Sequence, residues 1–259
     1  MILKKNFFVV LLVLLVIFTG INSKIVNAEE VTGQEIMDRV DDNLFIDSGR
    51  MESELIIYDR GRERNKEMVS YIVSDGDVTN AFVEYVSPAR VRGRKYLMQG
   101  DDLWMYFPAA EDLQHISGHM LDEGMMGSDF SYQDLLESEQ LSDLYEFEKE
   151  ERDMIDDREV YVIKGVARED KEPAYYQRRF WVDTERYITL REEMYARGGR
   201  VLKVLKSQDI QEVEEGRWLP LKQVMEDKLK ADTHTTHRIN KIELGYEVPE
   251  EKLSLDYLQ

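Results

Sequence analysis

The sequence predicts a mainly β protein of the α+β class, in which one helix precedes a long series of antiparallel strands. Apolar and polar residues alternate in short segments that recur roughly every ten residues, which is typical of a sandwich or a barrel. No long helical pattern separates these segments, which disfavours a parallel α/β fold. An apolar, Met-rich stretch from Leu113 to Leu136 interrupts the series. We expect the strands to form one domain organised around this insertion.

The N-terminal residues have the composition of a signal peptide. Two lysines precede an unbroken apolar run over residues 7–18, and Val26-Asn27-Ala28 places small residues before a cleavage site. We expect cleavage after Ala28, export to the periplasm and a single domain over residues 29–259. An uncleaved anchor is the alternative, because the residues that follow the run would lengthen it toward a membrane span.

The charge of the chain restricts its partners. It has 34 basic and 53 acidic residues, a net charge of −19 and no cysteine. This acidity excludes nucleic acid, whose phosphates need a basic surface. The absence of cysteine excludes thiol catalysis and Cys-ligated metals, so the fold depends on core packing alone. The chain is long enough for one sizeable core, and we expect a monomer.

A helix is predicted over residues 33–44. Thr32 and Glu35 have the spacing of a capping box, and Ile36 and Val40 lie on one helical face after it. Alternation and turn residues predict the strands that follow. These segments are residues 51–58, 68–73, 78–86, 94–98, 103–107, 113–116, 144–150, 159–166, 175–182, 187–195, 201–208, 219–227 and 233–244.

The insertion has the properties expected of a lid over an apolar cavity. Gly118, Gly124 and Gly127 divide it, and glycine allows backbone conformations that a hinge needs. Methionine adapts to ligands of irregular shape. The alternative is that these side chains fill an ordinary core where the sheet curls. The candidate cavity and lid residues are Trp104, Tyr106, Met120, Met125, Met126, Phe130, Tyr132 and Leu135.

The segment 103–107, LWMYF, is apolar on both faces. Such a strand is either covered on both sides or faces a cavity on one side. The sequence leaves open which face lines the cavity. Leu103, Met105 and Phe107 are the alternative to Trp104 and Tyr106.

A basic cluster stands out in this acidic chain. Arg92, Arg94 and Lys95 lie within residues 90–95, which hold one further cation, Arg90. They are candidates for contact with a lipid phosphate or with an acidic patch on a partner. The alternative is a solvated edge strand whose charges prevent aggregation.

No catalytic constellation emerges from the sequence. His115 and His119 have a zinc-ligand spacing, but Gly118 lies between them and the HExxH pattern is absent. His234 and His237 fall on opposite faces of a predicted strand. The serines lack a GxSxG context, and no phosphate-binding loop is present. We therefore expect no enzyme activity, no cofactor and no metal site.

Four segments resemble the outer-membrane lipoprotein-sorting proteins, the LolA-like periplasmic carriers. These segments are residues 92–97 (RGRKYL), 102–108 (DLWMYFP), 115–118 (HISG) and 126–135 (MGSDFSYQDL). The last is the most specific. The resemblance extends from the N-terminal helix to the closing VPEEKLSLDYL, and so covers essentially the whole chain after the signal peptide.

The resemblance implies an incomplete antiparallel β-barrel of about eleven strands with a short helical lid. It also implies a non-enzymatic carrier that holds acyl chains of a lipidated protein or lipid in a hydrophobic cavity. An inner-membrane exporter and an outer-membrane acceptor are the implied partners. An envelope sensor or transporter-accessory protein built on the same barrel is the alternative, and an exported enzyme is a third hypothesis.

Overall fold

The computed structural model describes residues 31–76, 78–138 and 141–258. The expected signal peptide lies outside this part of the chain. From Thr32 onward the described residues form one unit. It contains one antiparallel sheet in the order β6-β5-β4-β3-β2-β1-β13-β12-β11-β10-β9-β8-β7. Because β6 and β7 are the two edges and do not pair with each other, the barrel is incomplete, as expected.

The strands are β1 (Ser48–Asp59), β2 (Arg62–Asp75), β3 (Val78–Ser87), β4 (Lys95–Gln99), β5 (Asp102–Phe107), β6 (Asp112–Ile116), β7 (Tyr145–Ile155), β8 (Arg158–Ala167), β9 (Gln177–Asp183), β10 (Thr189–Tyr195), β11 (Val201–Glu214), β12 (Arg217–Asp227) and β13 (Thr233–Leu244). The helices are α2 (Gly33–Leu44), η1 (Gly118–Asp122), η2 (Met125–Gly127), α3 (Tyr132–Glu137), α4 (Leu141–Leu144), η3 (Glu250–Leu253) and α5 (Leu255–Leu258).

The N-terminal helix begins and ends as its sequence predicts. The Thr32 side chain accepts a hydrogen bond from the Glu35 amide, and the Glu35 carboxylate accepts one from the Thr32 amide. Ile36, Met37 and Val40 are buried on one face. This amphipathic face packs α2 against β7 and β12.

Every segment predicted to be a strand forms one, and the sheet holds thirteen strands instead of about eleven. Each alternating segment finds a partner across a short connection, so none drops out of the sheet. The pairing of β1 with β13 joins the two ends of the series. It brings the N-terminal hairpins beside the C-terminal strands and makes a single continuous surface.

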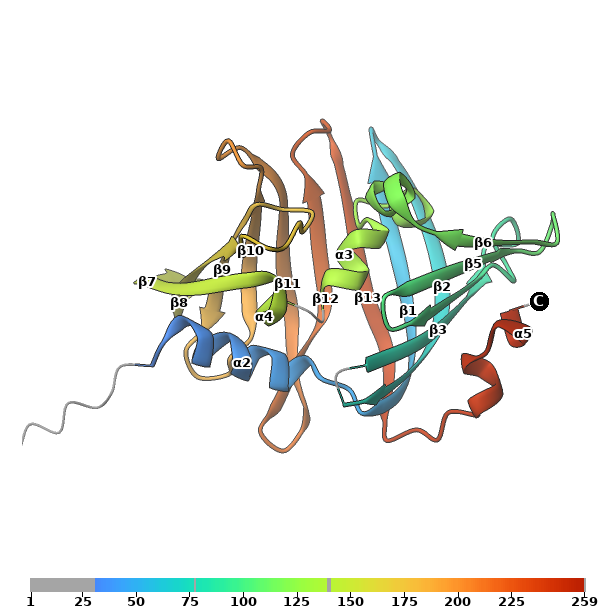
Figure 1. The fold of residues 1–259 in the computed structure, drawn as a ribbon, viewed down its shortest axis with the longest axis horizontal. Helices are drawn as coiled ribbons and strands as arrows, with labels where there is room; N and C mark the ends of the chain where they lie inside the picture. Colours follow the sequence, from blue (N-terminus) through green and yellow to red (C-terminus); the bar gives the residue numbers. More distant parts are fainter. Residues whose placement is uncertain (1–30, 77, 139–140, 259) are drawn as a thin grey trace, which may run out of the picture. The chain divides into compact units, whose positions relative to one another are not determined.

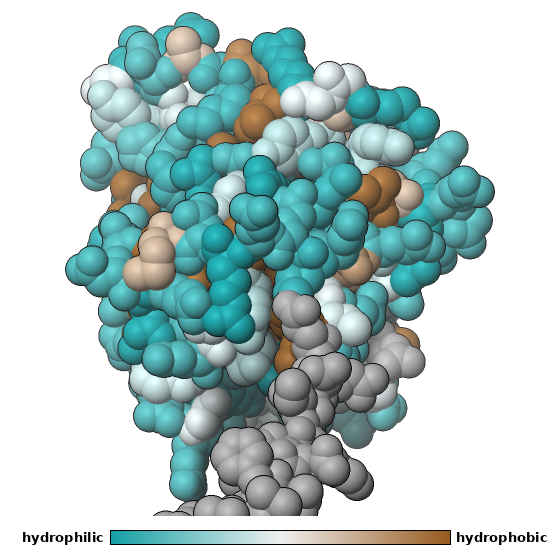
Figure 2. Space-filling view, turned by 90° about the vertical axis from the view of Figure 1, so that its left-hand side faces the viewer, coloured by the Kyte–Doolittle hydropathy of each residue, from teal (hydrophilic) through white to brown (hydrophobic). Residues whose placement is uncertain are grey.

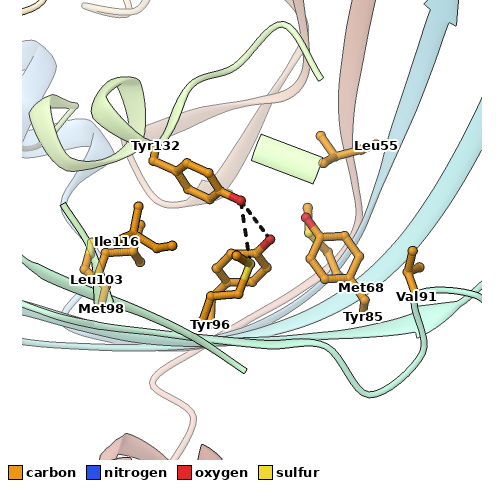
Figure 3. Close-up of a cluster of buried hydrophobic side chains, with 10 residues drawn as sticks. Leu55, Met68, Tyr85, Val91, Tyr96, Met98, Leu103, Ile116 and Tyr132 are labelled. Carbon is orange, nitrogen blue, oxygen red and sulfur yellow. Dashed lines mark hydrogen bonds between the residues drawn. The ribbon is translucent and has the colours of Figure 1, made fainter. Parts of the chain in front are cut away.

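The sheet curves, so its two faces meet different helices. Figure 1 shows the sheet bending around α3, whereas α5 lies on the other side of β3. On the inner face lies a buried cluster that we call the inner cluster (Figure 3). It consists of Leu55, Met68, Tyr85, Val91, Tyr96, Met98, Leu103, Met105, Ile116 and Tyr132.

The outer face of the same strands has its own cover. Phe82 and Leu97 are fully buried there against Leu258 of α5. The Lys95 ammonium donates hydrogen bonds to the carbonyls of Tyr257 and Leu258, at 2.8 and 2.9 Å. The C-terminal segment therefore excludes water from a face of the sheet that would otherwise expose apolar side chains.

Candidate functional site: a pocket beside a helical lid

Residues 118–137, which include η1, η2 and α3, form the segment that we call the lid. Gly118 and Gly127 adopt the left-handed conformations that glycine tolerates, with φ of +57° and +75°. At Gly124 a Cβ atom would lie 2.3 Å from the Ser128 carbonyl oxygen, so no other residue fits. A capping box between Ser131 and Asp134 then begins α3.

The apolar side chains of the lid segment pack against the inner cluster. Tyr132 belongs to that cluster, and its hydroxyl lies 3.1 Å from the Tyr96 hydroxyl and 3.7 Å from Met105 Sδ (Figure 3). The other lid side chains that pack on the cluster are Met120, Leu121, Met125, Met126, Phe130, Leu135 and Leu136. The insertion is thus a cover for the inner face of the sheet.

Beside the lid lies a pocket of about 690 Å³. This volume falls in the range of small-molecule sites, roughly 300–1,000 Å³. Its lining residues are Asp41, Leu44, Phe45, Ile46, Ile72, Ser74, Gly76, Val78, Thr79, Met98, Gly100, Asp101, Leu136, Ser138, Ser142, Asp143, Leu144 and Lys171. Because Met98 belongs to the inner cluster and Leu136 packs against it, the pocket and the lid share a wall.

Three of the pocket residues are large apolar side chains that face water. Leu44, Phe45 and Val78 are 41, 47 and 49% exposed. Figure 2 shows one face of the molecule, on which apolar residues emerge only in small patches among hydrophilic ones. A group of exposed apolar side chains around one pocket is the arrangement expected of a site for an apolar ligand.

Trp104 and Tyr106 lie on the other face of the sheet from the lid, which corrects their assignment to the cavity. Both pack in the outer group with Leu97 and Leu258. The alternative face, with Leu103, Met105 and Phe107, faces the inner cluster. Successive side chains of a strand point to opposite faces. Because the C-terminal segment covers the outer face and the lid covers the inner one, β5 can be apolar on both faces without a cavity on the outer side.

The three basic residues proposed as one contact surface separate in the structure. Arg92 is exposed, and its Nε donates to the Val86 carbonyl at 3.0 Å. Lys95 holds the C-terminal segment on the outer face. Arg94 turns inward and places Nη1 3.5 Å from Met126 Sδ of the lid. A common phosphate site of these residues is therefore wrong, and only Arg94 reaches the lid.

Buried charges connect the lid to the far half of the sheet. Asp134 of α3 accepts hydrogen bonds from Lys203 of β11 and from the Tyr175 hydroxyl, both at 2.6 Å. Burial alone would raise the pKa of Asp134, but the Lys203 ammonium and these hydrogen bonds hold it below its usual value. At neutral pH this carboxylate is ionised, and it holds the start of α3 against Lys203 of β11 and against Tyr175.

A second ionic anchor holds the end of α3. The Arg178 guanidinium lies 2.9 Å from Glu137 and 2.8 Å from Glu192, and all three side chains are buried. Burial lowers the pKa of Arg178, but Glu192, the Tyr145 hydroxyl and Glu137 more than offset this effect and raise it. Sequence reasoning missed both anchors, because the partners are 14–69 residues apart and no local motif marks them.

Two further contacts hold the middle of the lid. The Asp129 amide donates to the Thr235 hydroxyl at 2.9 Å, and that hydroxyl donates to the Asp129 carboxylate at 2.8 Å. The Lys66 ammonium donates to the Met126 carbonyl. Each polar group that the lid buries in these contacts thus has a partner on the sheet. These hydrogen bonds lower the free-energy cost of burying the polar groups when the lid is closed.

The histidines do not form a metal site. His115 of β6 contacts Asp102, with Nε2 3.0 Å from the carboxylate, whereas His119 lies in η1. His234 stacks on Tyr58, and burial lowers the pKa of His237 to about 4, so that it is neutral at physiological pH. Within residues 31–76, 78–138 and 141–258, no three metal-ligating side chains come together.

None of the helices in the described ranges is both long enough and apolar enough to cross a bilayer.

Solved structures with this fold include outer-membrane lipoprotein-sorting proteins. A DUF1329 family protein from Desulfovibrio piger matches with 22% identity and a TM-score of 0.82, over 88% of this chain and 98% of its own. A protein domain from Vibrio parahaemolyticus, described as outer membrane lipoprotein-sorting, matches with 22% identity and a TM-score of 0.77, over 87 and 97%. A LolA superfamily protein from Nitrosomonas europaea matches with 23% identity and a TM-score of 0.71, over 88 and 99%.

A comparison with curated proteins gives no significant match. A family model described as "-like: Uncharacterized protein" matches residues 77–259, which is more than half of the chain. The predicted resemblance to LolA-like proteins is thereby confirmed for the fold. The chain belongs to the family of that model, and its fold is that of the LolA superfamily and of outer-membrane lipoprotein-sorting domains.

Proposed function

We propose that this protein is a non-enzymatic periplasmic carrier that shields the acyl chains of a lipidated protein or lipid from water. The observation that carries the proposal is the pocket beside the lid, where Leu44, Phe45 and Val78 are exposed and where Met98 and Leu136 lie in the wall that the pocket and the lid share. An acyl chain that enters past Leu44 and Phe45 would continue along this wall toward the inner cluster.

The energetics of desolvation favour such a ligand. Each methylene moved out of water contributes about 0.8 kcal/mol, so even part of an acyl chain gains several kcal/mol in an apolar pocket. The binding side chains supply this apolar contact and no bond chemistry. The proposed contacts are Met98 and Leu136 in the wall, and Met120, Met125, Met126, Phe130, Tyr132 and Leu135 of the lid.

The lid would set how far the chain penetrates. Its own side chains now occupy the inner face of β2 to β5, where an acyl chain would lie if the lid moved outward. The polar anchors at Asp129, Asp134 and Glu137 would then be exchanged for water, so the open and closed states would be close in free energy. Loading and release would follow from a shift between these two states.

The partners follow from the same proposal. We infer an inner-membrane exporter that loads the cargo and an outer-membrane acceptor that receives it. The net charge of −19 would speed encounter with basic patches on such partners.

Binding of a synthetic triacylated lipopeptide by the purified protein tests the proposal. We expect the wild-type chain to bind the lipopeptide, and Leu136→Asp to weaken binding at least tenfold because it places a carboxylate in the shared wall. Leu229→Asp is the matched control, since Leu229 is 55% exposed and lies outside the pocket. Equal binding by both variants, with the melting temperature of each unchanged, would exclude the pocket as the acyl site.

A further inference from the structure

Three polar side chains lie near one another on the inner face of the sheet, namely Lys66 on β2, Tyr85 on β3 and Arg94 directly before β4. Lys66 lies two residues before Met68 on β2 and therefore shares its face. Met68 is paired with Tyr85 of β3, and the Tyr85 amide donates to the Arg94 carbonyl at 3.0 Å. Tyr85 points into the inner cluster with Met68 (Figure 3).

One lid residue covers this group. The Lys66 ammonium donates to the Met126 carbonyl, and Arg94 Nη1 lies 3.5 Å from Met126 Sδ. Met126 has φ of +54°, a conformation that is unfavourable for a side chain of this size. The lid thus offers a carbonyl and a thioether, two weak neutral acceptors, to two cations.

These donors lack an anionic partner in the part of the chain that the structure describes. Neither Lys66 nor Arg94 forms an ion pair there, although acidic residues outnumber basic ones in the sequence. Lys66 is only 4% exposed. Burial lowers its pKa to about 8, and the nearby guanidiniums of Arg64, Arg90 and Arg94 act in the same direction. The Tyr85 hydroxyl is buried and has no hydrogen-bond partner among the described residues.

We propose that Lys66, Arg94 and Tyr85 bind a phosphate group, such as that of a lipid headgroup, beneath the η2 part of the lid. Phosphate oxygens accept charge-assisted hydrogen bonds from ammonium and guanidinium groups and are stronger acceptors than a carbonyl or a thioether. The inference rests on the proposed carrier function and specifies its cargo, because it selects lipids that carry a phosphate.

Binding at this site would also open the lid. A phosphate can reach Lys66 only if the Met126 carbonyl leaves, so the ligand binds the open state and displaces the closed one. The headgroup would then lie at η2 while the acyl chains follow the inner cluster. Binding of the cargo would break the hydrogen bond from Lys66 to the Met126 carbonyl, which otherwise keeps Met126 over the two cations.

The test compares two lipids that differ only in the phosphate. Dioleoyl phosphatidic acid and dioleoylglycerol are each titrated into the purified protein in a non-ionic detergent, with native mass spectrometry as the readout. We expect the wild-type protein to prefer phosphatidic acid by about tenfold or more, as charged hydrogen bonds imply. Lys66→Met, Arg94→Gln and Tyr85→Phe should each reduce that preference, measured in each variant as the ratio of its affinities for the two lipids.

Arg92→Gln is the matched control, because Arg92 belongs to the same basic segment but is exposed. Tyr85→Phe removes one oxygen atom without a change of shape, so it keeps the test valid if Lys66→Met does not fold. Competition by inorganic phosphate, lost in Lys66→Met, would support the site and show that it also takes the free ion. Equal wild-type affinity for both lipids, or an equal loss in Arg92→Gln, would overturn the inference and leave the carrier function standing. Failure to bind either lipid and the triacylated lipopeptide would reject both.

Discussion

Asp41 is the pocket residue whose protonation matters most for the fold. It lines the pocket from α2 and accepts a hydrogen bond from the Ser142 hydroxyl at 3.0 Å. Burial raises its pKa from 3.8 to about 6, and the charges of Asp38 and Asp42 act in the same direction. Because the folded pKa exceeds the ordinary value, the ionised form destabilises the fold. The cost is absent below pH 3.8, grows up to about pH 6 and is complete above that.

Replacing this carboxylate should stabilise the protein only where it is ionised. We expect Asp41→Asn to raise the free energy of unfolding by roughly 1–3 kcal/mol at pH 8 and to leave it unchanged at pH 3.5. Urea titrations at both pH values measure the difference. Asp170→Asn, at an exposed site outside the pocket, is the control and should show little change. An equal gain from Asp41→Asn at both pH values would contradict the account.

Arg178 neutralises two buried carboxylates, so its loss should be severe. We expect Arg178→Met to lower the free energy of unfolding by about 3–5 kcal/mol, because it leaves Glu137 and Glu192 buried without a cation. Denaturation in urea measures the effect. Arg152→Met removes an exposed pair with Glu159 and should cost about 1 kcal/mol or less. A similar cost for both substitutions would show that the buried network does not stabilise the fold.

At the scale of elements, the lid depends on α3 being tied to β11. Asp134 both caps α3 and accepts from Lys203 and Tyr175. We expect Asp134→Ala to speed amide exchange throughout residues 118–137 by about tenfold, while exchange in β1 and β13 stays slow. Hydrogen exchange with mass spectrometry resolves these segments. Asp122→Ala, at an exposed site in η1, is the control, and unchanged exchange in the lid of Asp134→Ala would refute this anchoring role.

The C-terminal segment should stabilise the sheet in the same way from the outer side. Leu258 is fully buried against Phe82 and Leu97. We expect Leu258→Ala to cost about 2–5 kcal/mol of unfolding free energy, because a cavity replaces a packed side chain. Leu229→Ala, at an exposed turn, should cost far less. Equal melting temperatures for the two variants would mean that α5 does not support the sheet.

Sequence reasoning predicted the elements well because their signals are local. The capping box fixed the start of α2, and alternation located each strand of the sheet. The segment 118–137 was set apart by composition, since Met and Gly residues broke the alternation, and its role as a lid stays a prediction. Which face of β5 met the lid was left open, because LWMYF is apolar on both sides and the outer face of the sheet is covered by α5, far along the chain.

The long-range features of the site were beyond sequence reasoning. The Arg178 network and the pairing of Lys66 with the lid join residues that only the folded sheet brings together. The prediction that the basic segment 90–95 forms one contact surface was wrong for the same reason. Arg92, Arg94 and Lys95 are close in sequence, but strand geometry and a turn send them in three directions.

At the scale of the whole molecule, one curved sheet gives two different surfaces. The outer face is closed by the C-terminal segment, whereas the inner face is covered by a lid held through polar contacts. A pocket lined by apolar and polar side chains, with exposed Leu44, Phe45 and Val78, opens beside that lid. The proposed carrier function would use this asymmetry, with a permanent wall on one side and a cover that moves on the other.

The most direct test of the carrier function is native mass spectrometry of the protein purified from its own cell envelope, with solvent extraction of what it holds. The account predicts a bound lipid or acylated peptide, present in the wild-type protein and in Leu229→Asp and lost in Leu136→Asp. A wild-type protein that is empty, and stays empty when lipoprotein or phospholipid is added, would contradict it.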